Sequence, residues 1–211
     1  MHNIYWAAVI FCGLLCISGL SHANSKIIED LGYRALQDGD YKSAIRYISF
    51  LATNGNVRAQ YNMGVFYRDG VEVQRDQLEA LRWFLKAADG GNMLAQYAAG
   101  LAFYRGQGSS PDPKTALDYF LKSALKGHAS APLNIGKLFY SGEGVTKNYK
   151  RAYFWWKLAS ERNAGGAEYN LRKLSKIMSE KDKKEAYELI AKCRAIPLKH
   201  CLKFLIPQDK R

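Results

Sequence analysis

Three glycines, Gly64, Gly100 and Gly136, lie 36 residues apart, and the sequence around each repeats one order of apolar and small residues. In every copy an alanine follows 16 residues after the glycine, at Ala80, Ala116 and Ala152. Self-similarity at a fixed period of about 20 to 50 residues is the signature of repeat architectures. The spacing therefore predicts a solenoid, in which each copy packs only against its neighbours.

Each copy is predicted to be an antiparallel pair of helices. In the first copy Met63, Phe66 and Tyr67 recur at helical spacing. After a glycine-marked turn, a second apolar stripe is formed by Ala80, Trp83, Phe84 and Ala87. Glycine inside a helix costs about 1 kcal/mol relative to alanine, so its recurrence indicates close packing there. The expected fold class is all-α, an α-solenoid of antiparallel helix pairs.

The turns of the copies agree with this prediction. Left-handed C-caps are expected at Gly70, Gly106 and Gly142. Asp112 precedes Pro113, which is the arrangement of an N-cap before a proline at the first helical position. Asp76 and Glu79 have the spacing of a capping box.

The repeated residues resemble a known family. The pattern A-x4-G-x2-[YF]-x2-G, then V, then A-x2-[WY]-x2-K-A, is similar to the Sel-one-like repeat, a relative of the tetratricopeptide repeat. The third copy carries Leu158 where the others have Lys86 and Lys122. The resemblance covers residues 57–163 and implies a helix-pair scaffold that binds partners.

Both flanks extend the predicted solenoid. Upstream, Gly32 and Ala44 are only 12 residues apart, which indicates a helix pair with a short turn at residues 38–40. Downstream, Ala167 keeps the period, but Arg172 replaces the glycine, so this segment is expected to form a terminal cap. The predicted domains are a signal peptide (1–23), a tetratricopeptide-like helix pair (24–56), three Sel-one-like repeats (57–166) and a basic C-terminal cap with a cysteine pair (167–211).

The first 23 residues are typical of a secretory signal peptide. Residues 4–20 are nearly all apolar, and the small-x-small sequence at 21–23 suits cleavage. The segment contains no lysine or arginine, so an uncleaved anchor is the alternative. Cys12 and Cys16 lack the preceding small residues of a lipoprotein signal. The expected location is the bacterial periplasm.

After cleavage only Cys193 and Cys201 remain, in an oxidising compartment where disulfides persist. We expect them to form a structural disulfide, with Pro197 between them ending a helix. A metal site that uses His200 is an alternative. A thioredoxin-like redox centre would need two intervening residues rather than seven.

The net charge of +12 comes entirely from residues after the first 23. From Arg172 onward there are 12 basic and 5 acidic residues, a net charge of +7. Because exported proteins do not normally meet nucleic acid, this charge is expected to contact acidic proteins, anionic lipid or cell-wall polymer. The alternative is a solvated surface that only keeps the protein soluble.

Catalytic patterns are absent from the sequence. It has no glycine-rich phosphate loop, no H-x3-H pair and no C-x2-C cluster, and Asp76 and Glu79 are explained by capping. His128 and His200 have no nucleophile pattern beside them. We therefore expect a protein that is not an enzyme and that uses no cofactor or metal.

The family resemblance also implies a binding groove, because the first helix of each pair lines the concave face of such solenoids. The implied partner-binding residues are Arg58, Tyr61, Val65, Arg68, Leu94, Tyr97, Leu101, Tyr104, Leu133, Lys137 and Tyr140. Tyrosines with interspersed basic residues are favoured at interface hot spots. The alternative is that some of these side chains pack between adjacent repeats.

The overall design is similar to that of MotX-type proteins, exported members of this family in sodium-driven polar flagellar motors. That resemblance implies an adaptor of the T ring, with MotY and stator proteins as partners. The alternatives are a periplasmic regulator or scaffold of envelope or polysaccharide signalling, and a secreted effector directed at a host.

Overall fold

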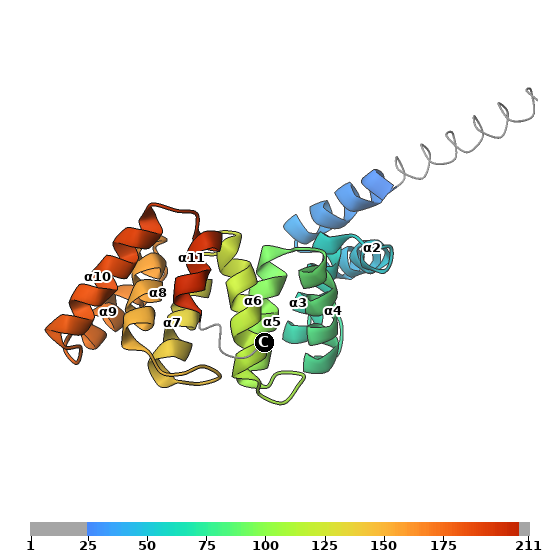
Figure 1. Ribbon diagram of the computed structural model, residues 1–211. Coiled ribbons are helices and arrows are strands. Elements are labelled where there is room, and N and C mark those ends of the chain that lie inside the picture. The colour runs from blue at the N-terminus through green and yellow to red at the C-terminus, as the bar shows by residue number, and fades with distance from the viewer. Residues whose placement is uncertain (1–24, 207–211) are drawn as a thin grey trace, which may run out of the picture. The chain divides into compact units, whose positions relative to one another are not determined.

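The computed structural model describes residues 25–206, and these form helices joined by turns, without a strand (Figure 1). The chain divides into two compact units, residues 1–83 and 84–211. The division falls inside α4 (Gln77–Asp89). The predicted all-α solenoid of helix pairs is confirmed.

The first unit holds the upstream helix pair and the first repeat glycine. Residues 25–37 are helical, and α2 (Tyr41–Thr53) and α3 (Val57–Asp69) follow. The turn at residues 38–40 is short because Asp40 caps α2 directly, accepting a hydrogen bond from the backbone N–H of Ser43 at 3.1 Å. The core of this unit gathers around Ile48, Leu51 and Phe66, which are almost fully buried.

The second unit is a run of helices, most of which pack against the next one along the chain. Its helices after α4 are α5 (Met93–Arg105), α6 (Pro113–Leu125), α7 (Ala131–Ser141), α8 (Tyr149–Glu161), α9 (Ala167–Ser175), α10 (Glu180–Arg194) and α11 (Leu198–Leu205). One continuous core runs from α6 to α11 and includes Phe120, Phe139, Trp155, Leu174 and Leu205, all at 0% exposure.

Close approach between helices accounts for the repeated glycines of this unit. A Cβ added to Gly100 on α5 would lie 2.7 Å from the ring of Phe120 on α6, nearer than real Cβ atoms come to a neighbour. A Cβ added to Gly136 on α7 would overlap the indole of Trp156 on α8. The predicted close packing at these two glycines is confirmed.

The helix ends follow the predicted turn chemistry with one exception. Gly70, Gly106 and Gly142 are left-handed C-caps. Asp112 caps α6, accepting hydrogen bonds from the N–H groups of Lys114 and Thr115, and Pro113 opens the helix. Asp76 accepts from the N–H groups of Leu78 and Glu79. The reciprocal half of the capping box is wrong, because the Glu79 carboxylate pairs with Arg82 and the Asp76 N–H donates to the Tyr67 carbonyl.

Within residues 25–206 no helix is long and apolar enough to cross a membrane. The predicted signal peptide, Cys12 and Cys16 lie outside the described residues.

Candidate functional site

The predicted groove residues of the second unit lie on α5 and α7, the first helices of neighbouring repeats. Lys137 on α7 places its ammonium 4.8 Å from the centre of the Tyr104 ring on α5. One turn earlier, the Asn134 side-chain amide donates to the hydroxyl of Tyr97 at 3.1 Å. These two contacts bring the corresponding faces of α5 and α7 together as one surface.

Part of this surface is open and part is packed. Leu94 is 42% exposed, and Lys137 is exposed beside the half-buried Tyr104 and Leu101. Neither α5 nor α7 contains an aspartate or a glutamate. The open part is therefore apolar and basic, without a carboxylate from its own helices.

Three of the predicted residues act mainly in packing between helices. Tyr97 stacks on the His128 imidazole with ring centres 4.1 Å apart. Tyr140 packs against Tyr149 and Trp156. Leu133 is half-buried and its backbone carbonyl accepts the Trp156 indole N–H at 3.0 Å. The contacts of Tyr140 and Leu133 join α7 to α8 within the third repeat. Of these three residues, Tyr97 also contacts the next repeat, through the side chain of Asn134.

In the first unit, the predicted residues lie on α3. Arg58 is exposed and places its guanidinium 3.7 Å from the centre of the Tyr33 ring in the preceding first helix. Burial raises the pKa of Tyr33 to about 12, against a smaller lowering by the Arg58 charge. In both units, a basic side chain on the first helix of one helix pair therefore lies over a tyrosine on the first helix of the pair before it. The two contacts are Arg58 over Tyr33 and Lys137 over Tyr104.

The remaining α3 residues are less available. Arg68 is half-buried and turns to its neighbour Asp69, with Nε donating to Oδ1 at 2.8 Å and Nη2 to Oδ2 at 2.7 Å. This hydrogen-bonded pair holds the pKa of the Asp69 carboxyl below its usual value. Tyr61 and Val65 are half-buried.

His128 lies in the turn between the second and third repeats, where its surroundings favour the uncharged form of the imidazole. Burial, and secondly the charge of Arg162, lower the pKa of its imidazole. The Arg162 guanidinium donates to the backbone carbonyls of Ala124, at 3.0 Å, and His128, at 3.3 Å. The imidazole therefore belongs to the packing of the turn and to the Tyr97 stack.

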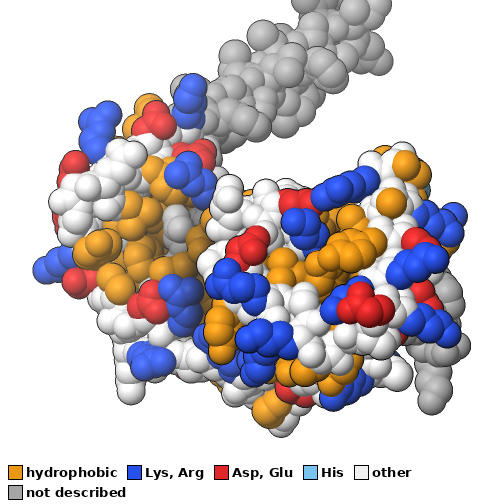
Figure 2. Space-filling view, turned by 90° about the vertical axis from the view of Figure 1, so that its left-hand side faces the viewer, with side chains coloured by type: hydrophobic (Ala, Val, Ile, Leu, Met, Phe, Trp, Pro, Cys, Tyr) orange, Lys and Arg blue, Asp and Glu red, His pale blue; other side chains and the backbone are white. Residues whose placement is uncertain are grey.

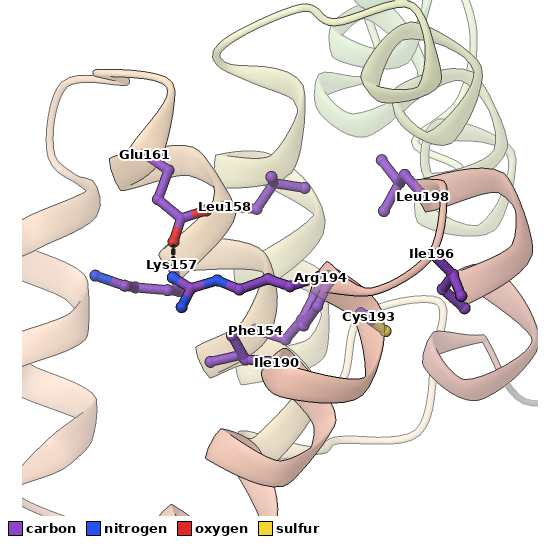
Figure 3. Close-up of a pocket in the computed structure, with 9 residues that line it drawn as sticks. All are labelled: Phe154, Lys157, Leu158, Glu161, Ile190, Cys193, Arg194, Ile196 and Leu198. Atoms are coloured by element: carbon purple, nitrogen blue, oxygen red, sulfur yellow. Dashed lines mark hydrogen bonds and ion pairs between the residues drawn. The ribbon is translucent and has the colours of Figure 1, made fainter.

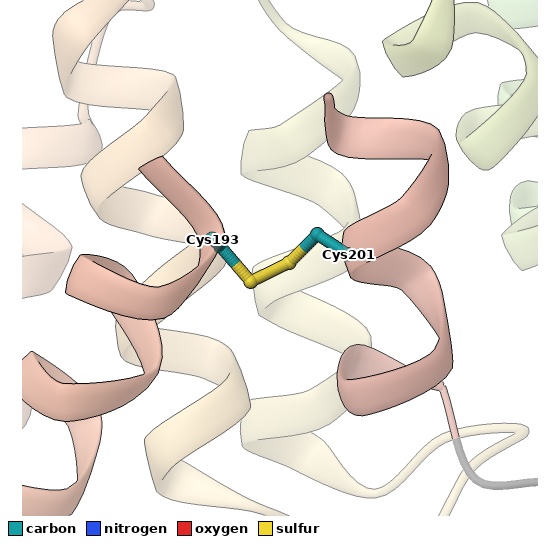
Figure 4. Close-up of a disulfide and its surroundings, with 2 residues drawn as sticks. All are labelled: Cys193 and Cys201. Atoms are coloured by element: carbon teal, nitrogen blue, oxygen red, sulfur yellow. A yellow bond between two sulfur atoms is a disulfide. The ribbon is translucent and has the colours of Figure 1, made fainter. Parts of the chain in front are cut away.

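Cys193 at the end of α10 and Cys201 on α11 form a disulfide, with their Cα atoms 5.3 Å apart (Figure 4). This is the disulfide predicted from the sequence. Both are buried, at 7% and 0% exposure. Because the two sulfurs are bonded to each other, neither is free as a thiolate ligand, and no cluster of three metal-binding side chains occurs within residues 25–206.

A pocket of about 200 Å³ lies next to the disulfide, between α8, α10 and the start of α11 (Figure 3). Its lining residues are Phe154, Lys157, Leu158, Glu161, Ile190, Cys193, Arg194, Ile196 and Leu198. Sequence reasoning missed this pocket because only one wall, α8, belongs to a repeat. The other walls come from α10, about 30 residues further along the chain, and from α11, which the sequence did not predict as a helix.

The basic C-terminal part covers one end of the second unit. Figure 2 faces this end and shows lysine and arginine side chains spread around an apolar patch. The exposed aromatic side chains of α9 and α10 are Tyr169, at 63%, and Tyr187, at 56%. The hydroxyl of Tyr187 lies 3.3 Å from that of Tyr153 on α8.

Three segments of the chain, residues 57–92, 94–128 and 129–163, match the Sel1 repeat. Among solved structures, a Sel1 repeat protein from Oxalobacter formigenes is 31% identical, with a TM-score of 0.62, over 66% of this chain and 58% of that one. The protein c5321, described as a protective antigen of uropathogenic Escherichia coli strains with an SLR fold, is 22% identical, with a TM-score of 0.57. That match covers 91% of this chain and 50% of c5321. No curated protein matches the chain.

Only half to three fifths of each of these two solved chains is matched, so the likeness extends to part of each. The match to c5321 shows the fold alone.

Proposed function

Because the chain belongs to the Sel1 repeat family, whose helix pairs typically form protein–protein interaction scaffolds, we propose that it works as a non-catalytic adaptor in the bacterial periplasm. Its partner-binding surface in the second unit is the face that α5 and α7 share.

The main support for this proposal is that exposed apolar and basic side chains lie beside a tyrosine ring on that face. Leu94 and Lys137 are exposed, Tyr104 lies under the Lys137 ammonium, and no carboxylate belongs to either helix. Tyrosine is one of the residues enriched among those that dominate binding energy at interfaces, and Tyr104 is the tyrosine of this face. The partner segment is expected to carry apolar side chains and acidic ones.

Export is supported by the apolar, uncharged segment at residues 4–20 and by the paired cysteines. Disulfides form and persist in the periplasm and are rare in the cytosol. Both features agree with a periplasmic location.

In its most concrete form, the proposal is a MotX-like component of the T ring in a sodium-driven polar flagellar motor. In that role the chain would bind MotY and help to hold stator proteins at the basal body. The support is the overall design of the chain: its length, its apolar N-terminal segment, three Sel1 repeats and one cysteine pair.

Crosslinking in intact cells of the source bacterium, with identification of the captured protein, tests this role. Capture of a basal-body protein, together with loss of swimming on deletion, is the expected result. Swimming that is unchanged by deletion, with no basal-body protein captured, contradicts the motor role.

The other candidate roles would give different results in the same cells. Capture of an envelope sensor or a polysaccharide-secretion component would indicate a signalling or secretion scaffold. Accumulation of the protein in the culture medium instead of the periplasm would indicate a secreted effector.

A further inference from the structure

The pocket beside the disulfide has an apolar interior. Phe154 and Leu158 line it from α8, Ile190 from α10, and Ile196 and Leu198 from the turn and first residue of α11 (Figure 3). Cys193 forms part of the wall, so the covalent link to Cys201 holds the α10 wall next to α11. The pocket lies on the second helix of the third repeat and on the C-terminal helices, away from the α5–α7 face.

The rim of the pocket is charged and leaves one cation available. Arg194 forms an ion pair with Glu161, which neutralises both groups at one side of the mouth (Figure 3). Lys157 also lines the pocket, and it forms no ion pair with any residue between 25 and 206. The segment from Arg172 onward carries a net charge of +7. An occupant that carries negative charge beside its apolar group is therefore favoured.

The size of the pocket indicates a single side chain. Binding sites for small molecules usually enclose about 300 to 1,000 Å³. A volume of about 200 Å³ is below that range and suits one bulky apolar anchor of a partner protein, the kind of group that fills pockets at interface hot spots.

We propose that this pocket is a second docking site, which takes one bulky apolar side chain from an acidic segment of a partner protein. The apolar side chain enters between Phe154, Ile190 and Leu198, and a neighbouring carboxylate of the segment pairs with Lys157. The site goes beyond the α5–α7 surface and does not depend on it.

Short peptides test the proposal on the purified, oxidised protein. The probe is acetyl-Glu-Glu-Trp-Glu-Glu-amide, and the two controls replace Trp with Ala or every Glu with Lys. Calorimetry gives the affinities, and NMR of the isoleucine and leucine methyl groups reports where each peptide binds. We expect the probe to bind at least about tenfold more tightly than either control, a difference of about 1.4 kcal/mol, and to shift the signals of Ile190 and Leu198.

Matched variants separate the pocket from general attraction to a basic protein. Lys157→Glu is expected to weaken binding of the probe about tenfold or more. Lys181→Glu, the same charge change at an exposed position in the first turn of α10, is expected to leave the affinity within about twofold. Leu198→Trp, which fills the pocket, is expected to abolish the methyl shifts while circular dichroism stays unchanged.

Three results would overturn the proposal. Equal affinities for the probe and its two controls would exclude a specific anchor. Equal effects of Lys157→Glu and Lys181→Glu would exclude pairing at the pocket rim. Tighter binding of decanoate than of the peptide, with the same methyl shifts, would assign the pocket to an anionic amphiphile. None of these results bears on the α5–α7 surface, which the in-cell capture experiment tests separately.

Discussion

Lys137 on α7 lies with its ammonium 4.8 Å from the centre of the Tyr104 ring on α5, so a charged contact joins the first helices of two successive repeats. At an exposed site such a cation–π contact contributes about 0.5 to 1 kcal/mol. The contact therefore adds little to stability, while it fixes the position of two groups on the open face.

Replacing Lys137 by alanine should lower the free energy of unfolding by no more than about 1 kcal/mol but should clearly reduce capture of the partner in cells. Urea denaturation and crosslinking yield measure the two effects. Lys199→Ala, an exposed lysine on α11, is the control and should change stability by less than about 0.5 kcal/mol. A large loss of stability with normal capture would mean that Lys137 serves the fold alone.

Gly100→Ala should destabilise the second unit. The added Cβ would meet the Phe120 ring, which is fully buried and has no room to move. Overpacking typically costs about 1 to 3 kcal/mol, and the better helix propensity of alanine offsets about 1 kcal/mol of that. A net loss of up to about 2 kcal/mol is expected in urea denaturation.

Gly165→Ala is the matched control for that substitution. Nothing lies within 4 Å of a Cβ at Gly165, and its φ is not left-handed, so stability should change by less than about 0.5 kcal/mol. Equal effects of the two substitutions would contradict the close approach of α5 and α6.

Breaking the disulfide should loosen the C-terminal helices. In the chain-entropy account, a closed loop of this length contributes about 2 to 3 kcal/mol. Cys201→Ser should therefore lower the denaturation midpoint, and reductant should lower the midpoint of the wild type but not that of the variant. Wild-type protein that migrates identically on reducing and non-reducing gels after thiol blocking would argue against the pairing.

Acidification should destabilise the protein through His128. Burial holds the folded-state pKa of this imidazole below its ordinary value of 6.5, with a smaller contribution from Arg162. As the pH falls below about 6.5, the unfolded chain takes up a proton that the folded protein resists, so stability decreases toward the lowered folded-state pKa.

The measurement is the free energy of unfolding at pH 7 and pH 5. His128→Gln should show a smaller decrease than the wild type over this interval. A His128→Gln variant with the full wild-type decrease would show that other groups control the acid response.

The helix pairs could be predicted because their determinants are local and repeated. Gly100 and Gly136 lie where a neighbouring helix approaches too closely for a larger side chain. Gly70, Gly106 and Gly142 end helices in the left-handed conformation. Both requirements are local to the repeat and do not depend on the rest of the chain. The capping box at Asp76 was only half right because Glu79 has a competing partner in Arg82, one turn further along α4.

The binding residues were harder to predict, since exposure depends on neighbours that the repeat does not encode. Tyr97 and Tyr104 occupy the same helix face, but His128 from a turn covers Tyr97. The pocket was missed altogether, because α11 is a helix of 8 residues tied to α10 by Cys193 and Cys201 and follows no repeat.

Site-specific photo-crosslinking from two matched leucines tests the central claim most directly. Leu94 on α5 and Leu125 on α6 have nearly equal exposure, 42% and 41%, but only Leu94 belongs to the predicted binding face. With a photoreactive residue at each position in intact cells, the protein should capture its partner from position 94 and not from position 125. Capture from position 125 alone, or equally from both, would contradict a binding surface formed by the first helices of the repeats.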